Sequence, residues 1–311
     1  MQRVTLPRRA GTFPNPARET VPILRRINRA VLLRRARDTH HLLESPDLRY
    51  PHFMISAWLD LPTVALFAVL ILFYGSITAL IVWLTAVSPL RAWIQSLSGV
   101  VAPFFAASSV LFALLTGFLA SDVGDRNRQA WQSVNRESTA ALTAYTLSIA
   151  STSDMTAIRT ALRDYLQSVV KDEWRSMADN GASSKTDVAF AALLRQVSDP
   201  AIATSAGQSV HNALLGAVVR IGEARSVRLS LSSDRTNDVK WMLVLILGVI
   251  TQVSLAVVHL ERTRAQLTAI VLFSIAATVA LGLIALQEQP FDGPLRIYPE
   301  PIETALKSMT N

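Results

Sequence analysis

Residues 61–90 read LPTVALFAVLILFYGSITALIVWLTAVSPL and contain no Lys, Arg, Asp or Glu. Three further stretches also lack these four residue types, at 92–121, 241–260 and 265–287. The hydrocarbon core of a membrane is about 30 Å thick, and roughly 20 helical residues suffice to cross it. The sequence therefore predicts four membrane-spanning helices, at about 61–87, 96–120, 241–260 and 266–286.

The composition agrees with a membrane protein. Half of the 311 residues are hydrophobic, only 17% are charged, and none is Cys. These values exclude a secreted disulfide scaffold, a disordered chain and an ordinary cytosolic enzyme. The predicted fold class is an all-α membrane protein, with four transmembrane helices and a helical cytoplasmic domain inserted between spans two and three. Its predicted parts are a basic cytoplasmic N-terminal segment (1–59), a first transmembrane hairpin (60–121), the helical cytoplasmic domain (122–240), a second hairpin (241–287) and a cytoplasmic C-terminal tail (288–311).

The charges predict the orientation. Residues 1–60 carry 11 Lys and Arg against 5 Asp and Glu, whereas residues 122–240 carry 14 against 13. Basic segments beside a first span tend to stay in the cytoplasm. We therefore expect both termini and the 122–240 domain to be cytoplasmic, in a multi-pass membrane protein. The net charge of +7 is then a signal of topology, and we expect no nucleic-acid partner.

Two polar segments have helical signals. Residues 21–37 combine apolar side chains with arginines, which fits either a helix on the anionic membrane surface or a solvated arm that only sets orientation. In the middle domain, apolar residues at three-four spacing predict helices over 154–180, 188–197 and about 202–232. Residues 122–150 contain no Pro, so the second span is expected to continue straight into this domain.

No catalytic or cofactor-binding motif is present. The sequence lacks a glycine-rich nucleotide loop, a nucleophile elbow and a zinc-binding histidine pair, and we predict no enzyme activity, no cofactor and no metal site. No ionisable residue lies deep in any span, which argues against coupled transport through a proton relay. The absence of ionisable residues in the spans is compatible with a passive pore lined by apolar and hydroxyl groups.

Three local strings resemble the bestrophin-like membrane proteins of bacteria. The first is Thr116-Gly117-Phe118 with Arg126 after it, and the second runs from Glu137 to Tyr145 as ESTAALTAY. The third is QPFDG at 289–293, followed by Pro-Glu-Pro at 299–301. The positions that carry the resemblance are Gly117, Arg126, Glu137, Tyr145, Pro290, Phe291, Gly293, Pro299 and Pro301.

The resemblance implies a homo-oligomer, expected to be a pentamer, in which span two lines a central pore. The apolar neck of bestrophins corresponds to Val110, Leu114 and Phe118 here. Residues four apart drift by only about 40° around a helix, so the three share one broad face. An apolar ring of this kind can block ions by dewetting. The alternative is that these side chains merely face lipid or another helix.

The sequence departs from calcium-activated bestrophins after the Pro-Phe pair. Those proteins have a dense acidic cluster there, whereas this chain continues Asp292, Gly293, Pro294, Leu295, Arg296. Because Ca²⁺ usually takes six to eight oxygen ligands, we predict no calcium site.

Two pairs of charged residues in the middle domain are candidates for a vestibule. Arg126 and Glu137 are about three turns apart, and Arg225 and Arg228 are at i and i+3. They fit either a cytoplasmic vestibule that concentrates anions or ordinary ion pairs between helices.

The resulting hypothesis is a bestrophin-like oligomeric ion channel or pore of the bacterial inner membrane, with itself, membrane lipids and inorganic ions as partners. The alternative hypothesis is a membrane-anchored signalling or scaffolding subunit whose helical domain binds a protein partner.

Overall fold

The computed structural model describes residues 52–96, 99, 102–178 and 181–310. Within them, all regular secondary structure is helical, which confirms the predicted all-α class. The expected helical segment at 21–37 lies outside the described residues. Four helices are long and apolar enough to cross a membrane: α3 (Thr63–Ala86), the first part of α5 (Ala102–Ala150), α11 (Asp238–Val258) and α12 (Thr263–Ala285).

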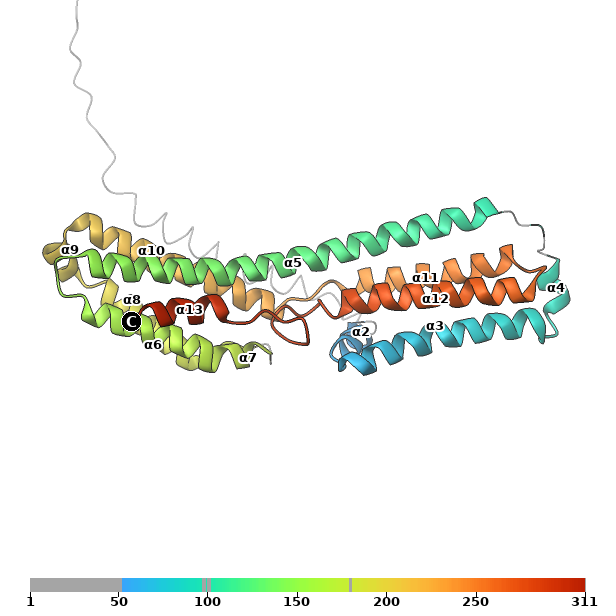
Figure 1. Cartoon of the computed structure of the whole chain (residues 1–311), viewed down its shortest axis with the longest axis horizontal. Coiled ribbons are helices and arrows are strands. Elements are labelled where there is room, and N and C mark those ends of the chain that lie inside the picture. The colour runs from blue at the N-terminus through green and yellow to red at the C-terminus, as the bar shows by residue number, and fades with distance from the viewer. Residues whose placement is uncertain (1–51, 97–98, 100–101, 179–180, 311) are drawn as a thin grey trace, which may run out of the picture. The chain divides into compact units, whose positions relative to one another are not determined.

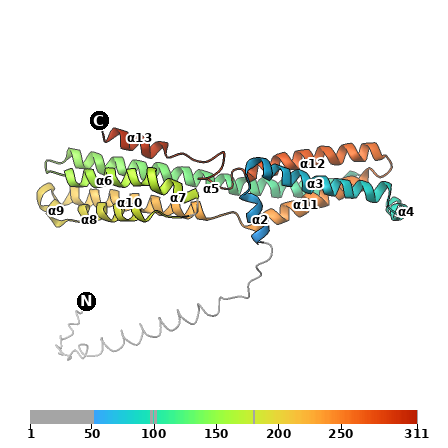
Figure 2. The same cartoon turned by 90° about the horizontal axis from the view of Figure 1, so that it is seen from below.

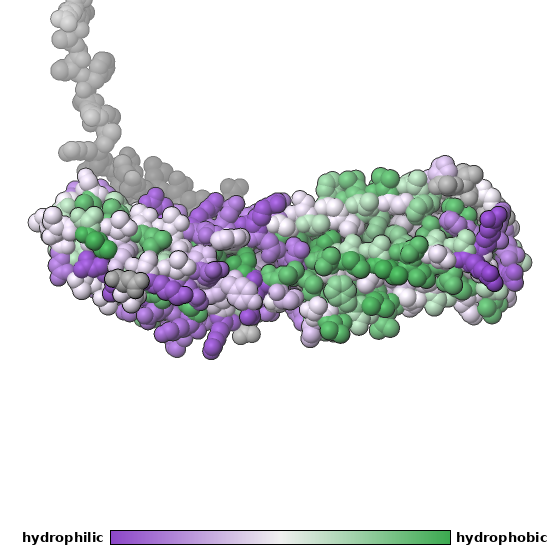
Figure 3. All heavy atoms as spheres, in the orientation of Figure 1, coloured by the Kyte–Doolittle hydropathy of each residue, from purple (hydrophilic) through white to green (hydrophobic). Residues whose placement is uncertain are grey.

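The four membrane-type helices form an apolar bundle. In Figures 1 and 2, α3, α11 and α12 lie beside the N-terminal half of α5. A short helix, α2 (His52–Leu59), packs into the same core through Ile55, Trp58 and Leu59, and α4 (Arg91–Gln95) follows α3. Hydrophobic side chains cover this half of the molecule on the face drawn in Figure 3. That surface is what lipid or another apolar partner would cover.

A glutamine ties three of these helices together. Gln252 of α11 is buried, and its Nε2 donates to Ser274 Oγ of α12 at 2.7 Å and to Thr78 Oγ1 of α3 at 3.2 Å. Away from water, such polar contacts hold helices together in addition to van der Waals packing. The bundle therefore has a defined register.

The remaining helices pack around the second half of α5 as a helical domain. They are α6 (Thr156–Ser168), the π-helical turn η1 (Val169–Glu173), α7 (Trp174–Ala178), α8 (Ser184–Val197), α9 (Pro200–Ala206), α10 (Gln208–Ser233) and the C-terminal α13 (Glu300–Ser308). The domain has one large core, to which α5, α6, α8, α10 and α13 all contribute. Because α5 is continuous from Ala102 to Ala150, it belongs to both cores, as the absence of Pro in 122–150 predicted.

The helix expected over about 202–232 is in fact two. Asp199 Oδ1 accepts the backbone N–H of Ala201 at 2.9 Å, so α9 begins at Pro200. Gly207 then separates α9 from α10 with φ of +91°, a conformation that L-residues rarely adopt. The apolar periodicity of residues 210–221 was compatible with one helix that began near residue 202. The Asp-Pro cap and the glycine instead set the helix boundaries.

Close packing in the apolar bundle leads to the first prediction. A Cβ on Gly248 of α11 would lie 2.3 Å from the hydroxyl oxygen of Tyr74, which is fully buried. We expect Gly248→Ala to destabilise the protein by about 1–3 kcal/mol through overpacking. Gly75 is the matched control, because a Cβ there meets nothing within 4 Å. Thermal unfolding in detergent should show a lower Tm for Gly248→Ala alone, and equal Tm values would contradict the packing.

Candidate functional site

The face of α5 that carries the neck candidates has no partner within the described chain. Val110 is 65% exposed, Leu114 49% and Phe118 61%. Within an apolar 18-residue stretch of each membrane-type helix, only 11% of the residues of α5 are buried. The corresponding shares are 28% for α3, 44% for α11 and 28% for α12. Of these four helices, α5 therefore leaves the largest share of its apolar length for something outside the subunit to cover.

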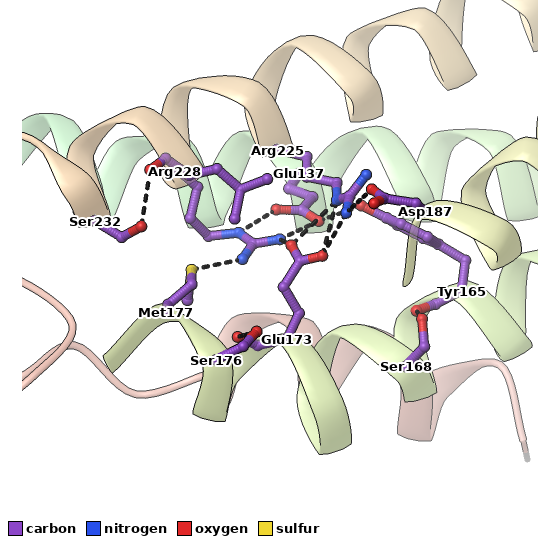
Figure 4. A network of polar contacts seen from close by, with 11 residues as sticks. Glu137, Tyr165, Ser168, Glu173, Ser176, Met177, Asp187, Arg225, Arg228 and Ser232 are labelled. Atoms are coloured by element: carbon purple, nitrogen blue, oxygen red, sulfur yellow. Dashed lines mark hydrogen bonds and ion pairs between the residues drawn. The ribbon is translucent and has the colours of Figure 1, made fainter. Parts of the chain in front are cut away.

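Further along, α5 contributes a buried carboxylate to the helical domain. Figure 4 shows Glu137 of α5 facing Arg228 of α10. Arg228 Nε donates to Glu137 Oε2 at 2.7 Å, and its Nη2 donates to Glu137 Oε1 at 3.0 Å and to Glu173 Oε1 at 2.9 Å. All three side chains are fully buried, and such two-pronged contacts are the strongest that Arg makes.

A second arginine extends this network towards the surface. Arg225 Nη2 donates to Glu173 Oε2 at 2.6 Å and to Asp187 Oδ1 of α8 at 2.7 Å. Burial by itself lowers the pKa of Arg225 and Arg228, but hydrogen bonds and attraction from Glu173 and Glu137 outweigh it and raise both above their usual range. Both guanidinium groups stay charged and hold buried carboxylates in ion pairs, so within the subunit Arg225 and Arg228 form ion pairs between helices.

The π-helical turn positions Glu173. The turn η1 lies between α6 and α7, where the i→i+5 pattern accommodates an extra residue. Glu173 ends it, buried beneath both arginines. Trp174 follows immediately, and its ring lies under Arg228 with the guanidinium carbon 5.3 Å from the ring centroid. An irregular turn in an amphipathic helical segment thus presents a carboxylate to both arginines and an aromatic face to Arg228.

Tyr165 completes the network and leads to the second prediction. Its hydroxyl donates to Glu137 Oε1 at 2.5 Å. Burial, with the nearby Glu137 carboxylate, raises the pKa of Tyr165 well above its usual value. Tyr165→Phe removes the hydrogen bond, so below about pH 9 we expect a loss of about 1 kcal/mol in unfolding free energy.

The same substitution should flatten the alkaline stability profile. Above about pH 10 the unfolded chain releases the phenol proton while folded Tyr165 keeps it, so the folded state loses stability as pH rises, by up to about 1.4 kcal/mol per pH unit. The Phe variant lacks this contribution. Chemical unfolding at several pH values checks the slope, and the exposed Tyr298→Phe is the control. Identical slopes for Tyr165→Phe and the natural chain would contradict the buried phenol.

Arg126 anchors the junction between the two cores. Its Nη1 donates to Glu288 Oε1 at 2.9 Å and to Thr236 Oγ1 at 3.1 Å, and its Nη2 contacts the backbone oxygen of Asp234. The same Glu288 oxygen accepts the backbone N–H of Thr236 at 2.6 Å. Arg126 therefore fastens α5 to the residues that precede α11 and follow α12, and it is separate from the Glu137 network.

The Pro-Phe and Pro-Glu-Pro strings fold the tail back onto the helical domain. Phe291 is buried, and its ring meets Trp174 edge-on with centroids 5.7 Å apart. Gly293 has φ of +80°, so the chain turns there, and the Pro290 carbonyl accepts the N–H of Ile297 at 2.7 Å. This loop leads into α13, and Pro299 is the N-cap residue of that helix.

Two residues of α5 hold this C-terminal helix. Ser138 Oγ donates to the carbonyl of Pro301 at 2.8 Å, and the Tyr145 hydroxyl donates to the carbonyl of Met309 at 3.1 Å. Tyr145 and Pro301 therefore both take part in holding α13 against α5, through Met309 and Ser138 respectively. Gly117 differs, because a Cβ there meets nothing within 4 Å and no close packing in the subunit requires a glycine.

Sequence reasoning found half of the charged network. Glu137, Arg225 and Arg228 stood out from their spacing, whereas Glu173, Asp187 and Tyr165 did not. A signal for Glu173 was present, because it lies on the apolar stripe of an amphipathic helical segment, four residues after Val169 and four before Met177. A carboxylate at such a position is buried only when it is paired.

The profile of one protein family spans most of the chain. It is described as the bestrophin-like domain, and it matches residues 62–302. The chain belongs to the bestrophin-like family. The match covers all four membrane-type helices, the helical domain and the beginning of α13.

Solved structures of a bestrophin homologue have the same fold. Three crystal structures of the bacterial protein from Klebsiella pneumoniae, two of them of variants, align with TM-scores of 0.61, 0.62 and 0.59 at 13%, 14% and 14% identity. The alignments cover 79%, 77% and 78% of this chain and 99%, 98% and 97% of those chains. No curated protein sequence matches the chain.

The described part of this bestrophin-like chain has no cluster of three or more His, Cys, Asp or Glu side chains that could hold a metal ion. Asp292, next to the Pro-Phe pair, uses its Oδ1 to accept the N–H of Gly293 at 2.7 Å. The carboxylates that are buried here are instead committed to arginine.

Proposed function

We propose that this bestrophin-like protein is an oligomeric ion channel or pore of the bacterial inner membrane, in which α5 lines the conducting path. The observation that carries the proposal is the unpartnered apolar face of α5, with Val110, Leu114 and Phe118 exposed along it. Family membership supports the ion-channel class. The resemblance to bestrophins implies five copies around a common axis.

In this arrangement the neck is an apolar ring on the axis. A narrow apolar ring excludes hydrated ions by dewetting, and a small rotation of its helices can replace the apolar side chains with others. The ion-pair network and Arg126 fix the rest of α5 to the helical domain. A motion of that domain is therefore transmitted directly to the neck by one continuous helix.

The basic bias of residues 1–60 supports an orientation with both termini and the helical domain in the cytoplasm. Membrane lipids then cover the outward faces of α3 and α12, where Leu72 and Leu283 are exposed. The permeating partners are inorganic ions.

Two measurements on the purified chain test this function. Native mass spectrometry gives the number of subunits, and an ion-sensitive dye in liposomes gives the flux. We expect a closed oligomer that passes ions. A monomer that passes none would reject the pore, and a stoichiometric protein partner that copurifies with a non-conducting chain would favour the scaffolding alternative.

A further inference from the structure

A groove of about 640 Å³ lies between α5 and α10 on the helical domain. The two helices run side by side in Figure 1. Their small side chains, including Ala140 and Ala224, leave the space open between them. The lining residues that matter here are Arg136, Thr139, Ala140, Arg220, Glu223 and Val227.

The rim of this groove carries positive charge that the described chain does not neutralise. Arg136 of α5 and Arg220 of α10 are both exposed, and neither has an ion pair or hydrogen-bond partner among the described residues. The inward-facing arginines of α10 differ, because Arg225 and Arg228 are occupied by Glu173 and Glu137. The buried carboxylates below are thus already paired and do not offset the rim.

The base of the groove is apolar and its edge has one carboxylate. Val227, 42% exposed, lies with Ala140 and Ala224 under the space, and Thr139 adds a hydroxyl. Glu223 is exposed on the same rim as the arginines. A ligand that fits must therefore combine an apolar body with an acidic group, and a second negative charge would meet repulsion from Glu223.

We propose that this groove binds a small organic monoanion, whose carboxylate is attracted to the exposed arginines of the rim, Arg136 or Arg220, and whose apolar body lies over Ala140, Ala224 and Val227. Guanidinium groups recognise carboxylates through paired, charge-assisted hydrogen bonds. The alanines provide a flat surface for a ring or a short chain. The exposed hydroxyl of Thr139 adds hydrogen-bond capacity without adding charge.

The position of the groove links it to the conducting face. Arg136 follows Phe118 by 18 residues, which is five turns or about 27 Å along an ideal helix, so both lie on the same side of α5. In the proposed pore the bound anion lies along the route to the neck. Binding itself does not depend on conduction, and only an effect of the ligand on flux rests on the proposed function.

Benzoate and its neutral isostere benzamide are suitable probes. Their dissociation constants are measured by ligand-detected NMR on the full chain in detergent, with empty micelles subtracted. We expect benzoate to bind at least about tenfold more tightly than benzamide, because a charge-assisted hydrogen bond contributes more than a neutral one. This preference should disappear in Arg136→Gln/Arg220→Gln and persist in Arg195→Gln, an exposed arginine outside the groove.

A second variant keeps both charges and fills the space. Thr139→Trp places an indole in the groove, and we expect it to weaken benzoate and benzamide alike, with an unchanged Tm as the check on folding. Equal binding of the two probes to the natural chain, or undiminished benzoate binding to the double variant, would overturn the proposal. A changed oligomer mass in the double variant would also overturn it, because a second copy would then be the occupant.

Discussion

Arg228→Met is expected to lower the unfolding free energy by about 3–5 kcal/mol, the range for breaking a buried ion pair by removing one partner. The substitution leaves Glu137 and Glu173, both fully buried, with only Arg225 to compensate them. Methionine is similar in length, so the loss comes mainly from uncompensated charge and lost hydrogen bonds. Thermal and chemical unfolding of the purified protein in detergent measure the change.

An exposed ion pair on α5, the helix that carries Glu137, provides the control for Arg228→Met. Arg128 of α5 pairs with Asp125 one turn earlier, and both side chains are at least half exposed. Such pairs contribute about 0–1 kcal/mol. We therefore expect Arg128→Met to change the Tm little, and a similar Tm for both variants would contradict the buried network.

The double variant Glu137→Gln/Arg228→Met separates coupling from general damage. If the two groups stabilise the fold through each other, the double variant loses less stability than the sum of the two single variants. Additive losses would mean that the two side chains act independently, contrary to the 2.7 Å contact between them.

Leu114→Ala and Phe118→Ala are expected to increase basal ion flux in liposomes at least about tenfold, which corresponds to lowering the barrier by about 1.4 kcal/mol. In the proposed neck both substitutions would widen the apolar constriction, and a wider neck stays wet. Leu283→Ala on α12 is the matched control, because Leu283 and Leu114 are each 49% exposed in the single subunit. Only a residue on the conducting path should alter flux, so an equal effect at Leu283 would refute the assignment of the neck.

The sequence predicted the apolar helices closely because their signal is strong and local. Span one was expected over 61–87 and is Thr63–Ala86, and span three was expected over 241–260 and is Asp238–Val258. The continuity of α5 through residue 122 followed equally well from the absence of Pro. In these cases hydrophobicity and helix breakers act within a few residues of the boundary.

The parts that the sequence did not reveal depend on contacts between distant segments. The sequence did not reveal the partner of Arg126, which is Glu288, 162 positions away in the chain. The π-helical turn that places Glu173 has no dependable local sequence signal. The interruption of the helix at Gly207 did have a local sequence signal, in the glycine itself and in the preceding Asp199-Pro200 pair. The apolar periodicity of α10 nevertheless favoured a single continuous helix.

The most direct measurement of the central claim uses the natural absence of cysteine. Leu114→Cys and, separately, Leu283→Cys are reconstituted in liposomes and treated with a positively charged methanethiosulfonate reagent while ion flux is recorded. If α5 lines the pore, modification changes the flux through Leu114→Cys and leaves Leu283→Cys unaffected. A flux through Leu114→Cys that stays constant after mass spectrometry has confirmed complete modification would contradict the account.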